Sequence, residues 1–179
     1  MPDWAIIALG ANLGDPRATL EQAIGRLSLR SARPILRSSF WNTSPVDCPP
    51  GSPVFVNAAV AIVPHAGETP DTLLDGLQSL EREFGRQVKI IMNEPRPLDL
   101  DLIAWGGRTV SSPRLTLPHP RAHLRKFVLQ PVSEILPQFI LPGQVGNITI
   151  LLQALVTDES VRPCTEPLSG GTSAPPVTP

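Results

Sequence analysis

Short runs rich in apolar residues recur along the chain, and they predict buried β-strands. Residues 4–9 are apolar without interruption and end at Gly10, a pattern typical of a strand that is covered on both faces. Residues 35–43 form a second strand candidate and residues 54–63 a third. The first strand is therefore expected in the centre of its sheet.

Two amphipathic helices are predicted between these strands. Asp15 as N-cap and Pro16 at the first helical position begin one helix, and Thr69 and Pro70 begin the other in the same way. Gly85 is expected to end the second helix. The apolar faces comprise Leu20, Ile24 and Leu27 in the first helix and Leu73, Leu77, Leu80 and Phe84 in the second.

Strict alternation of apolar and acidic residues marks the stretch Leu-Asp-Leu-Asp-Leu that begins at Leu98. In a strand, successive side chains point to opposite faces, so Asp99 and Asp101 share one face and the three leucines take the other. Two carboxylates this close repel each other unless a cation neutralises them. Mg²⁺ is the obvious candidate, and it favours phosphate chemistry. A solvated edge strand whose acids do nothing is the alternative.

The residues before this strand favour a ligand site over a solvated edge strand. Pro95 and Pro97 fix the backbone on both sides of Arg96, so a permanent guanidinium is presented near the acids by a stiff arm. This arrangement suits a nucleotide polyphosphate with its metal.

An amide within the third strand is a second candidate for chemistry. Phe55 and Asn57 share one face of residues 54–63, and Asn57 needs a polar partner there. It could be a buried amide bonded to neighbouring backbone, or it could contact a flat heterocycle beside Phe55. The sequence leaves the two interpretations equal. Four prolines between residues 44 and 53 predict a loop before this strand.

Basic residues follow both the second helix and the acidic strand. Arg86 and Lys89 are available for phosphate, although a solvated basic loop is the plain alternative. His119 stands between stiff prolines and two arginines, and Arg125 follows in a predicted short helix. Residues 127–135 are apolar at helical spacing but contain Pro131, which predicts two short helices.

Length and composition narrow the class of protein. The chain has 179 residues, of which 41% are hydrophobic, which fits one domain, predicted over residues 1–157. Residues 158–179 are predicted to be a disordered, proline-rich tail. The 15 basic and 16 acidic residues form no long run, so neither nucleic acid nor a membrane surface is an expected partner. Two distant cysteines and an N-terminus without a signal pattern predict a cytoplasmic protein.

Five ordered motifs together resemble the 6-hydroxymethyl-7,8-dihydropterin pyrophosphokinase family, over residues 4–142. They are the segments 9–14, 39–43, 56–60, 95–101 and 117–121. The resemblance implies an α+β, ferredoxin-like sandwich with a mainly antiparallel sheet, helices on one face and the active site on the other. It also implies transfer of pyrophosphate from ATP to the pterin hydroxymethyl group, with AMP as the second product, by a monomer.

The resemblance also implies roles for individual residues. Catalytic roles fall on Arg86, Arg96, Asp99, Asp101, His119 and Arg125. ATP is expected at Gln78, Glu81, Leu102, Arg114, Thr116, His119 and Arg121. The reduced hydroxymethylpterin is expected at Thr43, Ser44, Val46, Phe55, Asn57, Asp99 and Phe127. Two Mg²⁺ ions are expected on Asp99 and Asp101.

Two positions depart from the family pattern. Some members carry a second arginine where this chain has Val88, and a stacking tryptophan where it has Asn93, while Lys89 could replace the lost charge. A non-catalytic binding module on the same scaffold is the competing hypothesis, since one fold serves many functions. A metal-dependent glycosyltransferase ranks last, because the chain has no recognisable sugar-nucleotide domain.

Overall fold

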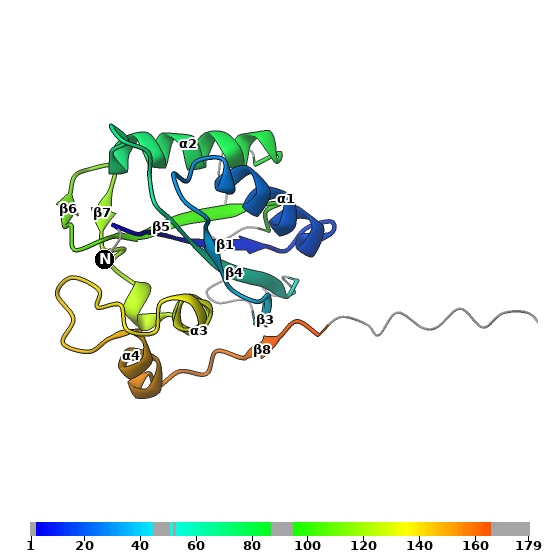
Figure 1. The fold of residues 1–179 in the computed structure, drawn as a ribbon. Coiled ribbons are helices and arrows are strands. Elements are labelled where there is room, and N and C mark those ends of the chain that lie inside the picture. The colour runs from blue at the N-terminus through cyan, green and yellow to red at the C-terminus, as the bar shows by residue number, and fades with distance from the viewer. Residues whose placement is uncertain (1–2, 45–50, 52, 87–94, 166–179) are drawn as a thin grey trace, which may run out of the picture.

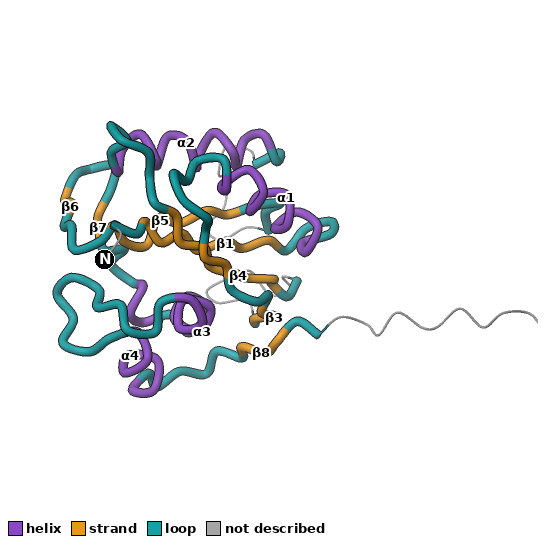
Figure 2. The backbone as a smooth tube through the Cα atoms, in the orientation of Figure 1, coloured by secondary structure: helices purple, strands orange, loops and turns teal. Residues whose placement is uncertain are grey.

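One antiparallel sheet of six strands forms the centre of the molecule (Figures 1 and 2). The structure, a computed structural model, describes residues 3–44, 51, 53–86 and 95–165. The strand order is β5-β1-β4-β3-β8, with β2 also paired to β4. These strands are β1 (Ala5–Ala11), β2 (Leu36–Arg37), β3 (Trp41–Thr43), β4 (Phe55–Ile62), β5 (Asp99–Trp105) and β8 (Val161–Pro163). A separate two-stranded sheet joins β6 (Val110–Ser111) to β7 (Thr116–Leu117).

Within the described residues, four α-helices and a short 3₁₀ helix pack on the large sheet. They are α1 (Pro16–Ser28), α2 (Pro70–Glu83), η1 (Ala122–Leu124), α3 (Lys126–Ile135) and α4 (Ile148–Ala154). The order β1-α1-β3-β4-α2-β5, with β1 and β4 central in the sheet, is the split βαβ arrangement of ferredoxin-like folds. The predicted α+β class and antiparallel sheet are confirmed.

Helices cover both faces of the sheet. The odd-numbered residues of β1, such as Ile7 and Leu9, pack with α1 and α2, whereas Ile6 and Ala8 pack with α3. Figure 1 shows α1 and α2 above the sheet and α3 and α4 below it. The second face is therefore only partly open, and α3 frames the part where the predicted site lies. β1 is buried throughout, as its continuous apolar run predicted.

The predicted helix starts are confirmed by their caps. Asp15 accepts a hydrogen bond from the backbone of Ala18, and Thr69 accepts one from the backbone of Thr72. Gly85 follows α2 with φ of 88°, a left-handed conformation that glycine adopts without strain.

Two predicted element boundaries are wrong. Residues 35–43 form two short strands, because Ser38 turns inward and its hydroxyl accepts a hydrogen bond from Ala59 N of β4. Residues 126–135 form one helix despite Pro131. Pro131 lies on the buried face of α3 with Val128 and Val132, and this packing outweighs the one helical hydrogen bond that a proline cannot donate.

The predicted disordered tail is wrong for its first residues. Residues 158–165 are ordered, and β8 pairs antiparallel with β3 at the outer edge of the sheet. Composition favoured disorder because this segment buries little of its own surface, but backbone hydrogen bonds to an edge strand do not depend on apolar side chains. Residues 166–179 lie outside the described residues. Among the helices of the described chain, none is both long and apolar enough to span a membrane.

Candidate active site

The two acids of β5 lie on the face of the sheet that carries α3. Asp99 pairs with Gly10 of β1 and Asp101 with Ala8, while Leu98 and Leu100 belong to the core beneath α1 and α2. The alternation therefore places both carboxylates on one face, as predicted. The Asp99 side chain is 21% exposed and that of Asp101 is 38% exposed, so both can meet a ligand.

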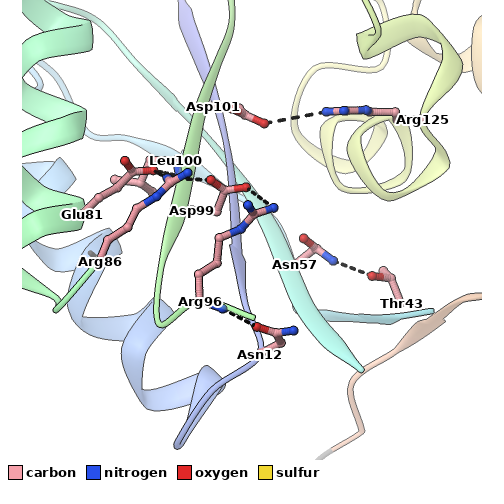
Figure 3. A network of polar contacts seen from close by, with 10 residues as sticks. All are labelled: Asn12, Thr43, Asn57, Glu81, Arg86, Arg96, Asp99, Leu100, Asp101 and Arg125. Carbon is pink, nitrogen blue, oxygen red and sulfur yellow. Dashed lines mark hydrogen bonds and ion pairs between the residues drawn. The ribbon is translucent and has the colours of Figure 1, made fainter. Parts of the chain in front are cut away.

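Two guanidinium groups hold the Asp99 carboxylate from opposite sides. Arg86 donates from Nη1 to Oδ1 at 2.7 Å, and Arg96 Nη2 lies 3.1 Å from Oδ2 (Figure 3). The Arg86 side chain is 26% exposed and that of Arg96 only 16%, so water screens these contacts weakly. The structure thus brings together three residues to which catalytic roles were assigned by resemblance.

Asn12 fixes the arm that carries Arg96. Its Oδ1 accepts a hydrogen bond from Arg96 N at 2.9 Å, and its own backbone N donates to Arg96 O at 3.3 Å. Its Nδ2 donates to Pro53 O at 3.5 Å. No role was predicted for this buried residue, although its place directly after β1, within Gly-Ala-Asn-Leu-Gly, was an available signal. The stiff proline arm is therefore also anchored by hydrogen bonds.

Glu81 connects the end of α2 to the edge of β5. Its side chain is buried, and its Oε1 accepts hydrogen bonds from Leu100 N at 2.7 Å and from Arg86. Burial raises the pKa of Glu81 to about 7, against the opposing effect of the Leu100 hydrogen bond and of Arg86. Its position is that of a support for Arg86, whereas the resemblance implied a place on the ATP side.

Among the described residues, Asp101 is paired less closely than Asp99. Its Oδ2 lies 3.8 Å from Arg125 Nη1, beyond hydrogen-bond range. Desolvation and the neighbouring Asp99 carboxylate raise the pKa of Asp101, so its charged form is destabilised. A hard cation between the two carboxylates would remove that penalty, and oxygen ligands suit Mg²⁺.

A metal at this position would take most of its ligands from elsewhere. Within the described ranges, no three His, Cys, Asp or Glu side chains form a cluster that could hold a metal. Mg²⁺ is commonly bound by one or two carboxylates together with substrate phosphates and water. The residues present therefore fit a metal that arrives with a phosphorylated ligand.

His119 follows β7 and is neutral near pH 7. Desolvation and the charges of Arg125 and Arg121 lower the pKa of His119 to about 4. Its Nδ1 accepts a hydrogen bond from Arg121 N at 3.2 Å, so the ring proton resides on Nε2. Its backbone N donates to Ile103 O at 2.7 Å, which ties it to β5. The ring can thus donate one neutral hydrogen bond to an anion without adding charge.

A second, uncharged group of residues lies across β1 from Asp99. Asn57 of β4 pairs with Gly10, and its Nδ2 donates to Thr43 Oγ1 of β3 at 2.6 Å (Figure 3). A Cβ at Gly10 would lie 2.7 Å from Asn57 Oδ1 and 3.8 Å from the Phe55 ring. Gly10 therefore leaves the space in which this amide sits. The Asn57 amide is buried and has a partner, but that partner is the Thr43 hydroxyl and not neighbouring backbone. Contact with a flat heterocycle stays a prediction.

The cationic and the uncharged groups touch at two places. The Arg96 guanidinium lies 6.0 Å from the centre of the Phe55 ring, and that of Arg125 lies 5.4 Å from the centre of the Phe127 ring.

Ser44 lies directly after Thr43, where its backbone N donates to Ser160 O. Arg125 is not inside a short helix as predicted, since it lies between η1 and α3 as the N-cap residue of α3.

The other residues predicted to contact ATP differ in exposure and in their neighbours. Leu102 is buried beneath α1 and α2, so only its main chain could contact a nucleotide. The exposed Arg114 pairs with Asp75 of α2, and Thr116 lies in β7. Gln78 and Arg121 are exposed. Four residues named in predictions lie outside the described residues: Val46, Val88, Lys89 and Asn93.

Comparison with known proteins decides the family. Residues 6–137 match the family model described as 7,8-dihydro-6-hydroxymethylpterin-pyrophosphokinase. The chain belongs to this family. It is 36% identical over 149 residues to the 2-amino-4-hydroxy-6-hydroxymethyldihydropteridine pyrophosphokinase of Synechocystis, covering 83% of this chain and 74% of that one. It is 38% identical over 140 residues to the Haemophilus influenzae protein of the same name, covering 78% and 85%. The resemblance drawn from the five motifs is confirmed.

Solved structures support the fold. A crystal structure of HPPK-DHPS in complex with substrates superimposes with a TM-score of 0.66 at 12% identity, over 86% of this chain and 43% of that one. Wild-type Plasmodium falciparum HPPK-DHPS with pteroate gives a TM-score of 0.65 at 12% identity, over 86% and 42%. The chain spans less than half of these longer proteins. At such low identity the likeness shows the fold alone, and it confirms the ferredoxin-like class.

Proposed function

We propose that this chain transfers a pyrophosphoryl group from ATP to the hydroxymethyl group of 6-hydroxymethyl-7,8-dihydropterin, as a step of folate biosynthesis. The products are the pterin diphosphate and AMP. Family membership supports pyrophosphokinase chemistry. The observation in the structure that carries the proposal is the pair Asp99 and Asp101, which lies among arginines and is separated from the Asn57 amide by the single strand β1.

The reaction requires positioning and charge neutralisation. The pterin hydroxyl oxygen bonds to the β-phosphorus of ATP, the bond from that phosphorus to the oxygen bridging to the α-phosphate breaks, and AMP leaves with that oxygen. The hydroxyl proton goes to solvent. Arg86, Arg96 and Arg125 supply three permanent positive charges where negative charge is redistributed. His119 adds a neutral donor beside them.

Asp99 and Asp101 are the residues that would hold Mg²⁺, and we propose two ions. When bound, such ions neutralise the phosphate oxygens and orient the chain of phosphates for in-line attack. The protein's contribution is to keep both carboxylates on one rigid strand and to keep Arg86 and Arg96 on Asp99. Glu81 and Asn12 in turn hold those two arginines.

The uncharged group is proposed to bind the pterin. Asn57, oriented by Thr43, offers an amide of fixed direction to the polar edge of the heterocycle. Phe55 and Phe127 offer apolar ring faces, the first beside Arg96 and the second beside Arg125. In this proposal, Ser44 and Val46 also lie on the pterin side. The ATP side comprises Gln78, Leu102, Arg114, Thr116 and Arg121.

The direct test is an assay of AMP release with ATP, Mg²⁺ and reduced hydroxymethylpterin. AMP formation that depends on both the pterin and Mg²⁺ is the expected result. The alternative, a non-catalytic binding module on the same fold, predicts pterin or ATP binding by calorimetry without AMP. Activity that persists in the presence of excess chelator would contradict the metal assignment while leaving the reaction in place.

Two parts of the proposal concern the state of the enzyme. We propose that it works as a monomer in the cytoplasm, on small-molecule substrates and without a nucleic acid or membrane partner. The near-balance of 15 basic and 16 acidic residues supports the choice of partners. Light scattering after size-exclusion chromatography would test the monomer, for which a mass near 19.3 kDa is expected.

A further inference from the structure

The segment after α4 returns to the proposed pterin side. The family match ends at residue 137, so nothing in that match assigns a role to residues 158–164. In Figure 1, the chain leaves α4 below the sheet and runs to β8, which lies against β3. Its contacts fall on Thr43, Ser44 and Phe127, three residues proposed to bind pterin.

β8 gives β3 a partner on its second edge. β3 is only three residues long, and without β8 it would be an edge strand held by β4 alone. Thr43 pairs with Phe55 on one side and with Val161 on the other. Beyond the strand, Ser44 N donates to Ser160 O at 3.0 Å and Ser160 N donates to Ser44 Oγ at 3.1 Å. Because Thr43 Oγ1 orients the Asn57 amide, a fixed β3 also fixes that amide.

Glu159 contacts a different residue of the proposed pterin side, Phe127. α3 begins at Lys126 without a side-chain cap from its own N-cap residue, Arg125. Glu159 supplies the missing acceptor, since its Oε2 takes a hydrogen bond from Phe127 N at 3.1 Å. A carboxylate at the first turn also suits the helix dipole. This contact holds the residue whose ring contacts Arg125.

We propose that residues 159–164 are a positioning element for the pterin substrate, in which β8 positions Thr43 and Glu159 positions Phe127. Simple protection of a sheet edge would need β8 but would not need a carboxylate at α3. The two contacts lie on the two walls of one proposed pocket, so a common purpose accounts for both. The inference rests on the proposed function, because it concerns the substrate of that reaction.

The first test compares neighbouring acids in the full-length chain. Glu159→Ala should raise the KM for the pterin about fivefold, in line with the usual cost of losing a helix cap, while the KM for ATP stays unchanged. Glu159→Gln keeps an oxygen acceptor and should restore most of the pterin affinity. Asp158→Ala, which changes the adjacent exposed acid, is the matched control and should match the parent.

The second test addresses β8 without relying on turnover. Ser160→Pro removes the N–H that donates to Ser44 and should speed amide exchange at Ser44 and weaken pterin binding in calorimetry. Thr165→Pro, beyond β8, should do neither. If Glu159→Ala and Ser160→Pro both leave pterin affinity unchanged in an active parent, the inference is wrong. A parent that forms no AMP would instead refute the proposed function, and Phe127 amide exchange in Glu159→Ala would still report on the cap.

Discussion

The proposed site has a phosphate half and a pterin half, and the two are built from different kinds of residue. The phosphate half holds three acids and three arginines in contact across α2, β5 and the start of α3, and two of the acids have raised pKa values. The proposed pterin half, on β3, β4 and the start of α3, relies on one amide–hydroxyl hydrogen bond and aromatic rings. Buried charges need a ligand of opposite charge to offset the cost of their desolvation, whereas neutral groups recognise a ligand through the fixed positions of their side chains.

One glycine separates the halves. Gly10 pairs with Asn57 on one side and with Asp99 on the other, so the two residues stand two strand spacings apart, or roughly 10 Å. Gly10 itself carries no side chain, and the Asn57 amide lies over it. The following predictions test the contrast between the halves, beginning with the largest effect.

Loss of a carboxylate should disable the phosphate half. Asp101→Asn removes a charge for which we propose that Mg²⁺ compensates, so kcat should fall by about 100-fold or more, equivalent to roughly 2.7 kcal/mol. The fold should remain intact, because Asp101 is 38% exposed and its ion pair with Arg125 is long. Steady-state assays and circular dichroism provide the measurements. Asp71→Asn, at an exposed acid in the first turn of α2, is the control. Near-normal AMP formation would remove Asp101 from the site.

Loss of the amide should affect the pterin half selectively. Asn57→Ala should raise the KM for the pterin by about tenfold to thirtyfold, in line with a buried polar contact of 1.5–2 kcal/mol, and change the KM for ATP far less. Asn42→Ala, on the opposite face of neighbouring β3, serves as the control. Equal losses for both substrates would show that the halves are not separate.

The pH dependence of the free energy of unfolding should show that His119 is neutral in the folded protein. Its folded pKa of about 4 lies below the ordinary 6.5, so the unfolded chain binds the proton first. The lowered pKa therefore contributes to the free energy of unfolding. That contribution is fully present above pH 6.5 and is lost as the pH falls toward 4, so the free energy of unfolding changes by up to about 1.4 kcal/mol per pH unit. Urea unfolding of the parent and of His119→Gln between pH 7 and pH 4 should show a shallower slope in the variant. Parallel slopes would place a charged histidine in the site.

The outermost ATP residue should matter least. Arg114 and its partner Asp75 are both more than half exposed, and such pairs contribute little to stability. Arg114→Ala should therefore leave the melting temperature unchanged and raise the KM for ATP by no more than about fivefold, since water screens an exposed charge. Arg26→Ala, which removes a similarly exposed pair with Glu83, should change neither quantity.

Local patterns predicted most of the phosphate half. The alternation around Asp99 and Asp101 and the proline-flanked Arg96 are properties of neighbouring residues, and strand geometry alone puts both acids on one face. The supporting residues did not follow from the sequence in the same way. Glu81 is 18 positions before Asp99, and only the packing of α2 against β5 brings it to Leu100 N. Asn12 meets Arg96 across 84 positions.

The sequence by itself determined the strands, the capped helices, the shared face of the two acids and the family, because each depends on the order of nearby residues or on several motifs together. Only the tertiary structure decided the continuity of α3 through Pro131, the orientation of Asn57 by Thr43, and the return of residues 158–164 to the pterin side. In each of these cases the deciding free energy comes from contacts between residues far apart in the chain. Local propensity, which disfavoured helix at Pro131 and order beyond residue 157, was outweighed by burial and by hydrogen bonds to an open strand edge.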